Sequence, residues 1–294
     1  MLLRPRLTLD RMAIEEAGPQ PEWLAEAILA QLGKSSAAIP IEDIAYALDI
    51  FEIRYEKLES YEGALLTTPE RDTGSILVNA KSAKPRRRFT LAHELGHYLN
   101  IWHKPHDEAG FMCNNRDFKV GNLIVKPALT AHEIQELQAN QFAIALLAPK
   151  QRVIALSNDD ASVRDVLRIA AELELSKEAA ARRYVETHVG KIAVVFTQNG
   201  EVKYPTKSSS CPSLAVRKGA RFLTALVREP GEISHEEIEI DLPAIDGRAR
   251  SKTAEAETFH QEGGHAFTIL SFEKEGEEED ETGVEDTYER FSRF

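Results

Sequence analysis

The stretch Arg88–Leu99, RFTLAHELGHYL, decides the fold of the N-terminal part of this chain, because it places H-E-x-x-H within one helical run. Side chains four residues apart lie on the same face of an α-helix, so the imidazoles of His93 and His97 can reach one metal ion. Glu94 lies about 100° around the helix from His93, beside the metal but not bound to it. The motif therefore predicts a zinc site in which Glu94 is the general base on a water molecule that the metal acidifies.

The residues around the motif distinguish a buried zinc helix from a surface helix that is rich in histidine and glutamate by chance. The flanking positions are apolar: Phe89, Leu91, Ala92, Leu95 and Leu99. A helix with these side chains is expected to be partly buried, and buried polar groups need partners. A zinc ion supplies that partner, so the context favours a metal site.

A catalytic zinc site needs a third protein ligand and keeps the fourth position for water. The favoured candidate is Glu136, on the next predicted helix, with Asn140 one turn later to hydrogen-bond a ligand. His103 is the second candidate, because it completes H-E-x-x-H-x-x-N-x-x-H, although a continuing helix would turn it away from the metal. Glu133, one turn before Glu136, is the third. Cys113 could approach the zinc as a reversible fourth ligand; otherwise it is an ordinary buried thiol.

Hydrophobic periodicity and helix breakers predict the other elements. Helices are expected at residues 21–32, 40–48, 85–103, 131–147, 163–173, 177–187 and 214–228. Strands are expected at residues 51–55, 63–67, 75–79, 191–196, 201–204, 233–240 and 266–273. The connection over residues 104–130 shows little periodicity, and a connection of that length is usually functional.

Two motifs, in this order along the chain, resemble the ImmA/IrrE family of metallopeptidases. Residues 88–99 are similar to the signature RFTLAHELGHYLL, and residues 136–149, ELQANQFAIALLAP, are similar to E-x-E-A-N-x-F-A-x-x-L-L-M-P. Upstream segments match in order too, so the likeness spans residues 20–150. Gln138 and Ala148 replace the usual Glu and Met, neither at an expected ligand, and the irregular connection is longer than usual.

The resemblance implies a gluzincin-like zinc peptidase with His93, His97 and Glu136 as zinc ligands and Glu94 as catalytic base. It also implies a biological role: narrow-specificity proteolysis of a helix-turn-helix transcriptional repressor, which induces a stress or mobile-element response. The alternative function is a transcriptional regulator or sensor with a structural or vestigial zinc site.

We therefore expect an α+β chain in four parts. A peptidase domain with a three-stranded sheet and zinc-binding helices occupies residues 20–150, and a helical, helix-turn-helix-like pair occupies residues 151–189. The radiation-response branch of the family implies an α+β, GAF-like module at residues 190–273. The acidic residues 274–294 are expected to form a disordered tail.

Composition excludes several classes of function. The chain has 36 basic and 48 acidic side chains, a net charge of −12, which argues against a general binder of nucleic acids or anionic membranes. Residues 150–191 carry nearly equal numbers of basic and acidic side chains, so DNA is not expected to be the main partner. No apolar run has the length of a membrane span or a signal peptide, so we expect no membrane partner. Two cysteines are too few for a disulfide scaffold and fit a reduced, cytoplasmic protein.

Overall fold

The computed structural model describes residues 7–33, 37–105, 111–113, 129–222, 228–245 and 248–273. It divides into two compact units, Met1–His188 and Val189–Phe294. The expected acidic tail, residues 274–294, lies outside the described residues. Within the described ranges, no helix has both the length and the apolar character that crossing a membrane requires.

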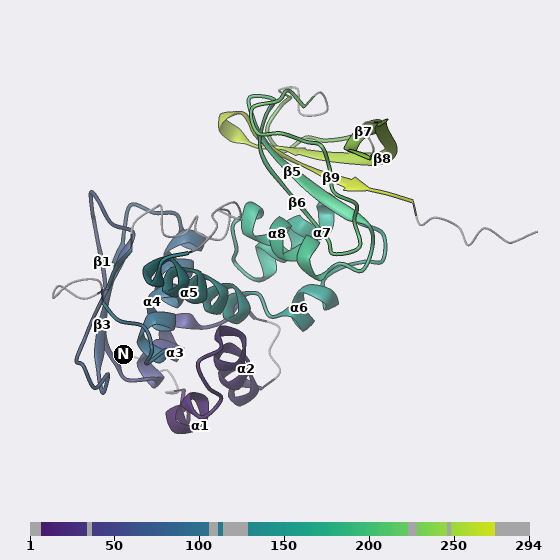
Figure 1. Ribbon diagram of the computed structural model, residues 1–294. Coiled ribbons are helices and arrows are strands. Elements are labelled where there is room, and N and C mark those ends of the chain that lie inside the picture. The colour runs from purple at the N-terminus through teal and green to yellow at the C-terminus, as the bar shows by residue number, and fades with distance from the viewer. Residues whose placement is uncertain are drawn as a thin grey trace, which may run out of the picture. The chain divides into compact units, whose positions relative to one another are not determined.

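The first unit combines a mixed sheet with helices that lie to one side of it (Figure 1). Its helices are α1 (Arg11–Glu15), α2 (Pro21–Leu32), α3 (Ile41–Ala47), α4 (Lys84–Leu99), α5 (Ala131–Leu147), α6 (Lys150–Ala155), α7 (Val163–Glu172) and α8 (Lys177–Thr187). Its strands are β1 (Ile50–Glu56), β2 (Gly63–Thr67), β3 (Gly74–Asn79) and β4 (Phe111–Cys113). The periodicity located most of these elements correctly, whereas α1, α6 and β4 are additions to the prediction.

The sheet of this unit has the order β1-β3-β2-β4, so it has four strands and the expectation of three is wrong. β1 pairs with β3 in parallel, and the other two pairs are antiparallel. The extra strand comes from the irregular connection: Phe111 pairs with Leu65 and Cys113 with Gly63. Phe111 and Cys113 are buried and Met112 between them is less so, but three residues are too few for alternation to reveal a strand in a sequence.

Helix α4 forms the centre of the first unit, between strands β2 and β3 on one side and α5 on the other. All residues from Thr90 to Leu99 are buried as a result. Two glycines allow close packing here. A Cβ atom at Gly74 would lie 3.1 Å from Tyr98 Cε2, and one at Gly96 would lie 2.9 Å from Phe142 Cδ1 on α5.

The helix expected over residues 85–103 ends at Leu99, where Asn100 leaves the helical region with ψ at 98°. The cause is a cation from another part of the chain. The Arg71 guanidinium, on the loop between β2 and β3, donates hydrogen bonds to the backbone carbonyls of His97, Tyr98, Asn100 and His103. Because these bonds satisfy carbonyls that the helix itself leaves open, the chain can turn back after α4.

Helices α7 and α8 pack against each other, and the helix-turn-helix-like interpretation of residues 151–189 stays a prediction. The fully buried Asp165 fixes the chain before α7, because its carboxylate accepts hydrogen bonds from the Asn158 backbone N–H at 2.8 Å and from the Tyr184 hydroxyl at 3.4 Å. These contacts describe a packed helical pair. That DNA is not its main partner stays a prediction.

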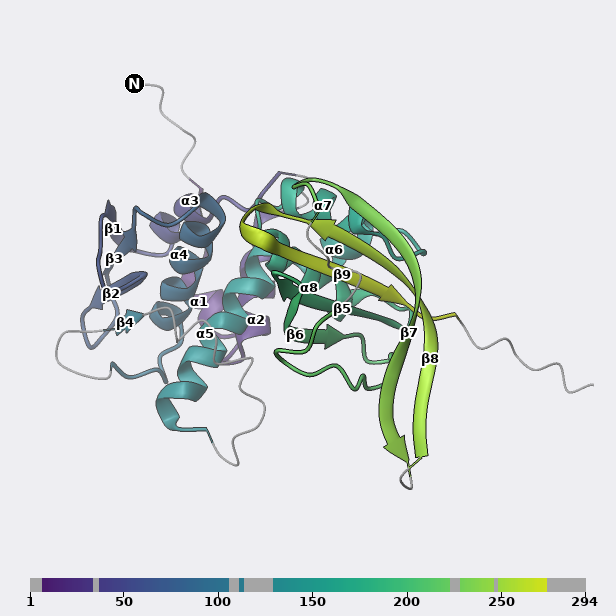
Figure 2. The same ribbon diagram turned by 90° about the horizontal axis from the view of Figure 1, so that it is seen from above.

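The second unit contains a five-stranded antiparallel sheet with the order β6-β5-β9-β8-β7 (Figure 2). The strands are β5 (Ile192–Gln198), β6 (Glu201–Lys207), β7 (Ile233–Ile245), β8 (Arg248–His260) and β9 (His265–Ser271), with a 3-10 turn at Glu262–Gly264. One side of the sheet buries a cluster that includes Val195, Ala256 and Leu270.

Two predictions for this unit are wrong. The helix expected at residues 214–228 is absent over 214–222, where Leu214 and Val216, two residues apart, both pack on the same apolar cluster, as an extended chain allows. Residues 223–227 lie outside the described ones. Strand β8 was not predicted, because its alanines and glutamates favour helices in isolation. The described residues of this unit contain no α-helix, and the GAF-like interpretation stays a prediction.

Candidate metal centre

Four buried side chains converge between α4, α5 and β4. His93 and His97 come from α4, Glu136 from α5 and Cys113 from β4. Their donor atoms all lie within 4.8 Å of one another. The structure thus brings together the two histidines and the glutamate that the sequence singled out, and places next to them Cys113, which the sequence offered only as a possible fourth ligand.

The spacing of the four donors fits a single tetrahedral ion. Donors around zinc, at bond lengths of about 2.0–2.3 Å, are separated from one another by about 3.3–3.8 Å. The two histidine Nε2 atoms lie 3.1 Å apart, and Glu136 oxygens lie 3.2 Å from His93 Nε2 and 3.3 Å from His97 Nε2. Cys113 Sγ lies 2.9 Å from His93 Nε2 and 3.9 Å from Glu136 Oε2. These separations lie on both sides of that range and within about 0.4 Å of it, so the cluster is close to the size that a zinc ion requires.

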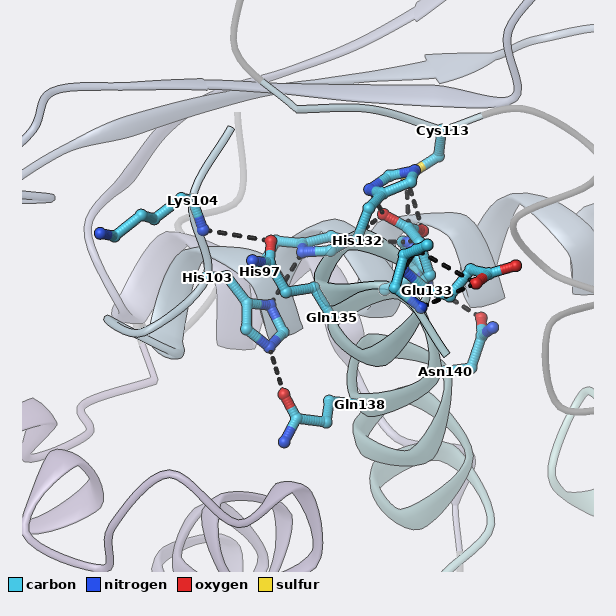
Figure 3. A network of polar contacts seen from close by, with 12 residues as sticks. His97, His103, Lys104, Cys113, His132, Glu133, Gln135, Gln138 and Asn140 are labelled. Atoms are coloured by element: carbon cyan, nitrogen blue, oxygen red, sulfur yellow. Dashed lines mark hydrogen bonds and ion pairs between the residues drawn. The ribbon is translucent and has the colours of Figure 1, made fainter. Parts of the chain in front are cut away.

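Hydrogen bonds on the far side of each ring orient both histidines. His93 Nδ1 donates to Asn140 Oδ1 at 3.0 Å, since an amide oxygen can only accept. His97 Nδ1 lies 2.9 Å from His103 Nδ1, and His103 Nε2 donates to Gln138 Oε1 at 2.9 Å (Figure 3). A neutral His103 ring protonated at Nε2 accepts at Nδ1, so His97 donates to it.

When both rings are neutral, each therefore presents the lone pair of Nε2 to the cluster, where the two nitrogen atoms and the Glu136 carboxylate face one another. Such an arrangement is repulsive without a cation among the donors. A proton can join only two of them, whereas a metal ion joins all four. The chemistry of the donor set thus fits a metal ion, and two nitrogens, a carboxylate and a thiol suit zinc.

Burial and charge shift the pKa values of these groups in directions that keep His97 and Glu136, but not His93, available as donors. Burial lowers the pKa of His97 to about 4 and that of His103 to about 3. Burial alone would raise the pKa of Glu136, but its hydrogen bonds to His93 and His97 outweigh burial and lower the pKa. Burial would likewise lower the pKa of His93, but the hydrogen bond with Glu136 raises it, so a proton competes with a metal at His93.

Glu94 lies beside this cluster and is not one of its four donors. Its side chain is fully buried, and its charge acts on the neighbouring His93. The carboxylate lies against the backbone of β2: a Cβ atom at Gly63 would be 2.7 Å from Glu94 Oε1. Glycine at residue 63 is therefore what makes room for the carboxylate next to the metal centre.

The other two candidates for the third ligand have different roles. His103 is buried, but it contacts the outer nitrogen of His97 instead of the cluster. Glu133 forms a capping box with Thr130 at the start of α5. Gln138 contacts none of the expected ligands directly, but a hydrogen bond to His103 connects it with His97.

Two residues of the site were missed or undervalued in the sequence. Arg71 turns the chain back toward His97, and no local pattern marks a residue that acts 26 positions away. Cys113 is fully buried at the cluster. A lone thiol in an aperiodic connection gave no reason to prefer it as a ligand over an ordinary buried residue.

Comparison with known proteins places this geometry in a family. Residues 50–184 match the model of the IrrE N-terminal-like domain, Peptidase_M78. This segment is similar to that family. The resemblance seen in the two sequence motifs is therefore confirmed, and the family name indicates a peptidase-like domain.

Two other comparisons add little to this assignment. No curated protein matches the sequence of the chain. Among solved structures, a Mycobacterium tuberculosis transcriptional regulator matches with 14% sequence identity and a TM-score of 0.46, over 85% of this chain and 74% of the other. A likeness of that degree supports no conclusion about function.

Proposed function

We propose that this protein is a zinc-dependent endopeptidase with narrow specificity. The observation that carries the proposal is the convergence of His93, His97 and Glu136 on one buried point, with Glu94 next to it, inside an IrrE N-terminal-like domain. Two histidines and one glutamate are a ligand set of catalytic zinc sites. The bound zinc would lower the pKa of water toward about 7 and polarise the scissile carbonyl.

The side chains of the protein would supply positioning and proton transfer. Asn140 and His103 hold the two imidazoles with their Nε2 atoms toward the donor cluster. Glu94 would accept a proton from the attacking water and deliver it to the amide nitrogen that leaves. Gly63 lets the Glu94 carboxylate lie close to the backbone of β2. In that position the carboxylate is next to the donor cluster, where the proton transfer would take place.

The proposed substrate is a helix-turn-helix transcriptional repressor, whose cleavage would induce a stress or mobile-element response. This part of the proposal rests on the ImmA/IrrE resemblance. A repressor acts in the cytoplasm, and the two cysteines, buried thiols that form no disulfide with each other, suit that compartment.

The test is co-expression of the protein with repressors that neighbouring genes encode, followed by mass spectrometry of new termini. Wild type should cut one repressor at one site. The Glu94→Gln variant should bind zinc but leave that repressor uncleaved. The control is Glu70→Gln, an exposed carboxylate in the same unit, which should cleave like wild type. A Glu94→Gln protein that still cleaves, or a wild-type protein that contains no zinc, would contradict the proposal.

A second candidate function follows from Cys113. A zinc ion held by four protein side chains is typical of structural sites. A permanent Cys113 ligand would therefore favour a transcriptional regulator or sensor with a structural zinc. In that case the regulatory phenotype should survive Glu94→Gln, with no cleavage product in either strain.

A further inference from the structure

Strand β4 covers the proposed catalytic centre through two of its three residues. Cys113 places Sγ 2.9 Å from His93 Nε2, and the Phe111 ring stacks on His97 with the ring centroids 4.8 Å apart. Each of the two histidines thus has a β4 side chain against it. Neither histidine exposes any surface.

The backbone holds the thiol in this place. Cys113 lies opposite Gly63 in the antiparallel pairing of β4 with β2, and the Glu62 N–H donates to the Cys113 carbonyl at 2.9 Å. Gly63 is also the residue against which Glu94 lies. The pairing of β4 with β2 therefore holds the Cys113 thiol at the cluster, and its Gly63 lies next to Glu94, the proposed general base.

This arrangement conflicts with hydrolysis as long as it persists. Peptide hydrolysis needs a coordination position for water, but three ligands and a thiolate fill a tetrahedral ion. It also needs access for a peptide, but His93, His97 and Glu94 are fully buried. Molecules in which Cys113 holds this place are expected to be inactive, and wild type cleaves through the molecules in which Cys113 has moved away.

We propose that Cys113 is a reversible fourth zinc ligand that keeps the peptidase latent, an inference that rests on the proposed function. On binding, the thiol loses its proton to solvent and the thiolate takes the position of the water molecule. On release, the thiolate regains a proton from solvent and water returns, so no oxidant or reductant takes part. The ligand is a thiolate of this chain, and it binds the divalent ion of the proposed active site.

The position of β4 in the sheet fits a reversible contact. Among the described strands, β4 is the terminal one of its sheet, has three residues and pairs only with β2. Extended peptides bind proteins by adding to exposed sheet edges. Departure of β4 would thus free a coordination position and expose the edge of β2 beside Glu94 in one event.

The first test uses cobalt(II) in place of zinc in the full chain, because a cobalt–thiolate bond gives intense near-ultraviolet charge-transfer absorption. Wild type and the control Cys211→Ser, which alters a thiol of the second unit, should show this absorption. Cys113→Ala should bind cobalt without this absorption. Its metal affinity should fall by at least about tenfold, because loss of a residue that only hydrogen-bonds a metal ligand already has an effect of that size. Bound zinc should also protect Cys113 of wild type from iodoacetamide, and a chelator should remove the protection.

The second test is basal cleavage of the repressor, which should be faster with Cys113→Ala than with wild type or Cys211→Ser. Wild-type protein that binds cobalt without thiolate absorption would contradict the proposal that Cys113 is a metal ligand, and it would not contradict the proposed peptidase function. Thiolate absorption without faster cleavage by Cys113→Ala would overturn reversibility and support the structural site. Wild-type protein that binds neither metal would overturn both proposals. The wild-type spectrum and the alkylation need no variant, so a Cys113→Ala protein that fails to fold does not prevent the test.

Discussion

The substitution Gly96→Ala tests whether the contact between α4 and α5 sets the geometry of the metal centre. A Cβ atom at residue 96 would lie 2.9 Å from Phe142 Cδ1 and 3.3 Å from Phe142 Cβ. Non-bonded carbon atoms prefer separations of about 3.5–4.0 Å. Because Phe142 Cβ is fixed to the α5 backbone, rotation of the ring cannot relieve the second contact. Helix α5 must therefore shift by a few tenths of an ångström.

Two effects of opposite sign determine the change in the free energy of unfolding. Overpacking a core costs about 1–3 kcal/mol. Replacing a glycine inside a helix by alanine stabilises by about 0.5–1 kcal/mol. The steric effect is the larger one, and we expect Gly96→Ala to lower the free energy of unfolding by about 1 kcal/mol. The shift of α5 also moves Glu136 and Asn140 relative to His93, so zinc affinity should fall by about tenfold.

Stability is measured by urea unfolding in the presence of a chelator, and affinity by competition with a chromophoric zinc chelator. The matched control is a double-mutant cycle with Phe142→Leu, since leucine removes the aromatic ring that causes the 2.9 Å contact and keeps the contact with Cβ. Gly96→Ala should cost less in the leucine background than in wild type. The reasoning is refuted if Gly96→Ala alone is as stable as wild type and binds zinc equally well.

Three further outcomes are expected. Gly63→Ala should slow repressor cleavage by about 10- to 100-fold, because its methyl group would clash with Thr90 Cγ2 and with the Glu94 carboxylate and displace both. Zinc content by atomic absorption should not change. Gln138→Ala removes the acceptor of His103 Nε2 and should weaken zinc binding by about tenfold in the chelator competition, and unchanged binding would show that His103 needs no support. Burial raises the pKa of Cys211 to about 11. Iodoacetamide should therefore label this thiol slowly at pH 8, and the rate should rise about tenfold with each pH unit up to 11. Labelling of the folded protein at pH 8 as fast as that of the protein unfolded in urea would contradict this pKa.

Local sequence patterns located the elements that follow from neighbouring residues and failed where a distant residue decides. The bounds of α2, α5 and α8 match the prediction, because the periodicity and the breakers or caps of each lie within the helix or next to it. The end of α4 does not, because Arg71 satisfies the last carbonyls from a different loop. Strand β8 was missed for the opposite reason. Its local preference is helical, and only pairing with β7 and β9 makes it extended.

The same distinction applies to the metal centre. His93, His97, Glu136 and Asn140 could be chosen from the sequence, since each lies one helical turn from another residue of the set and spacing alone puts them on shared faces. Cys113 has no such neighbour, and its place depends on β4 pairing with β2. Three ligands readable from helical spacing define a metal site, but the fourth position decides whether that site is open or closed. The residue that determines this property is therefore the one that periodicity could not assign.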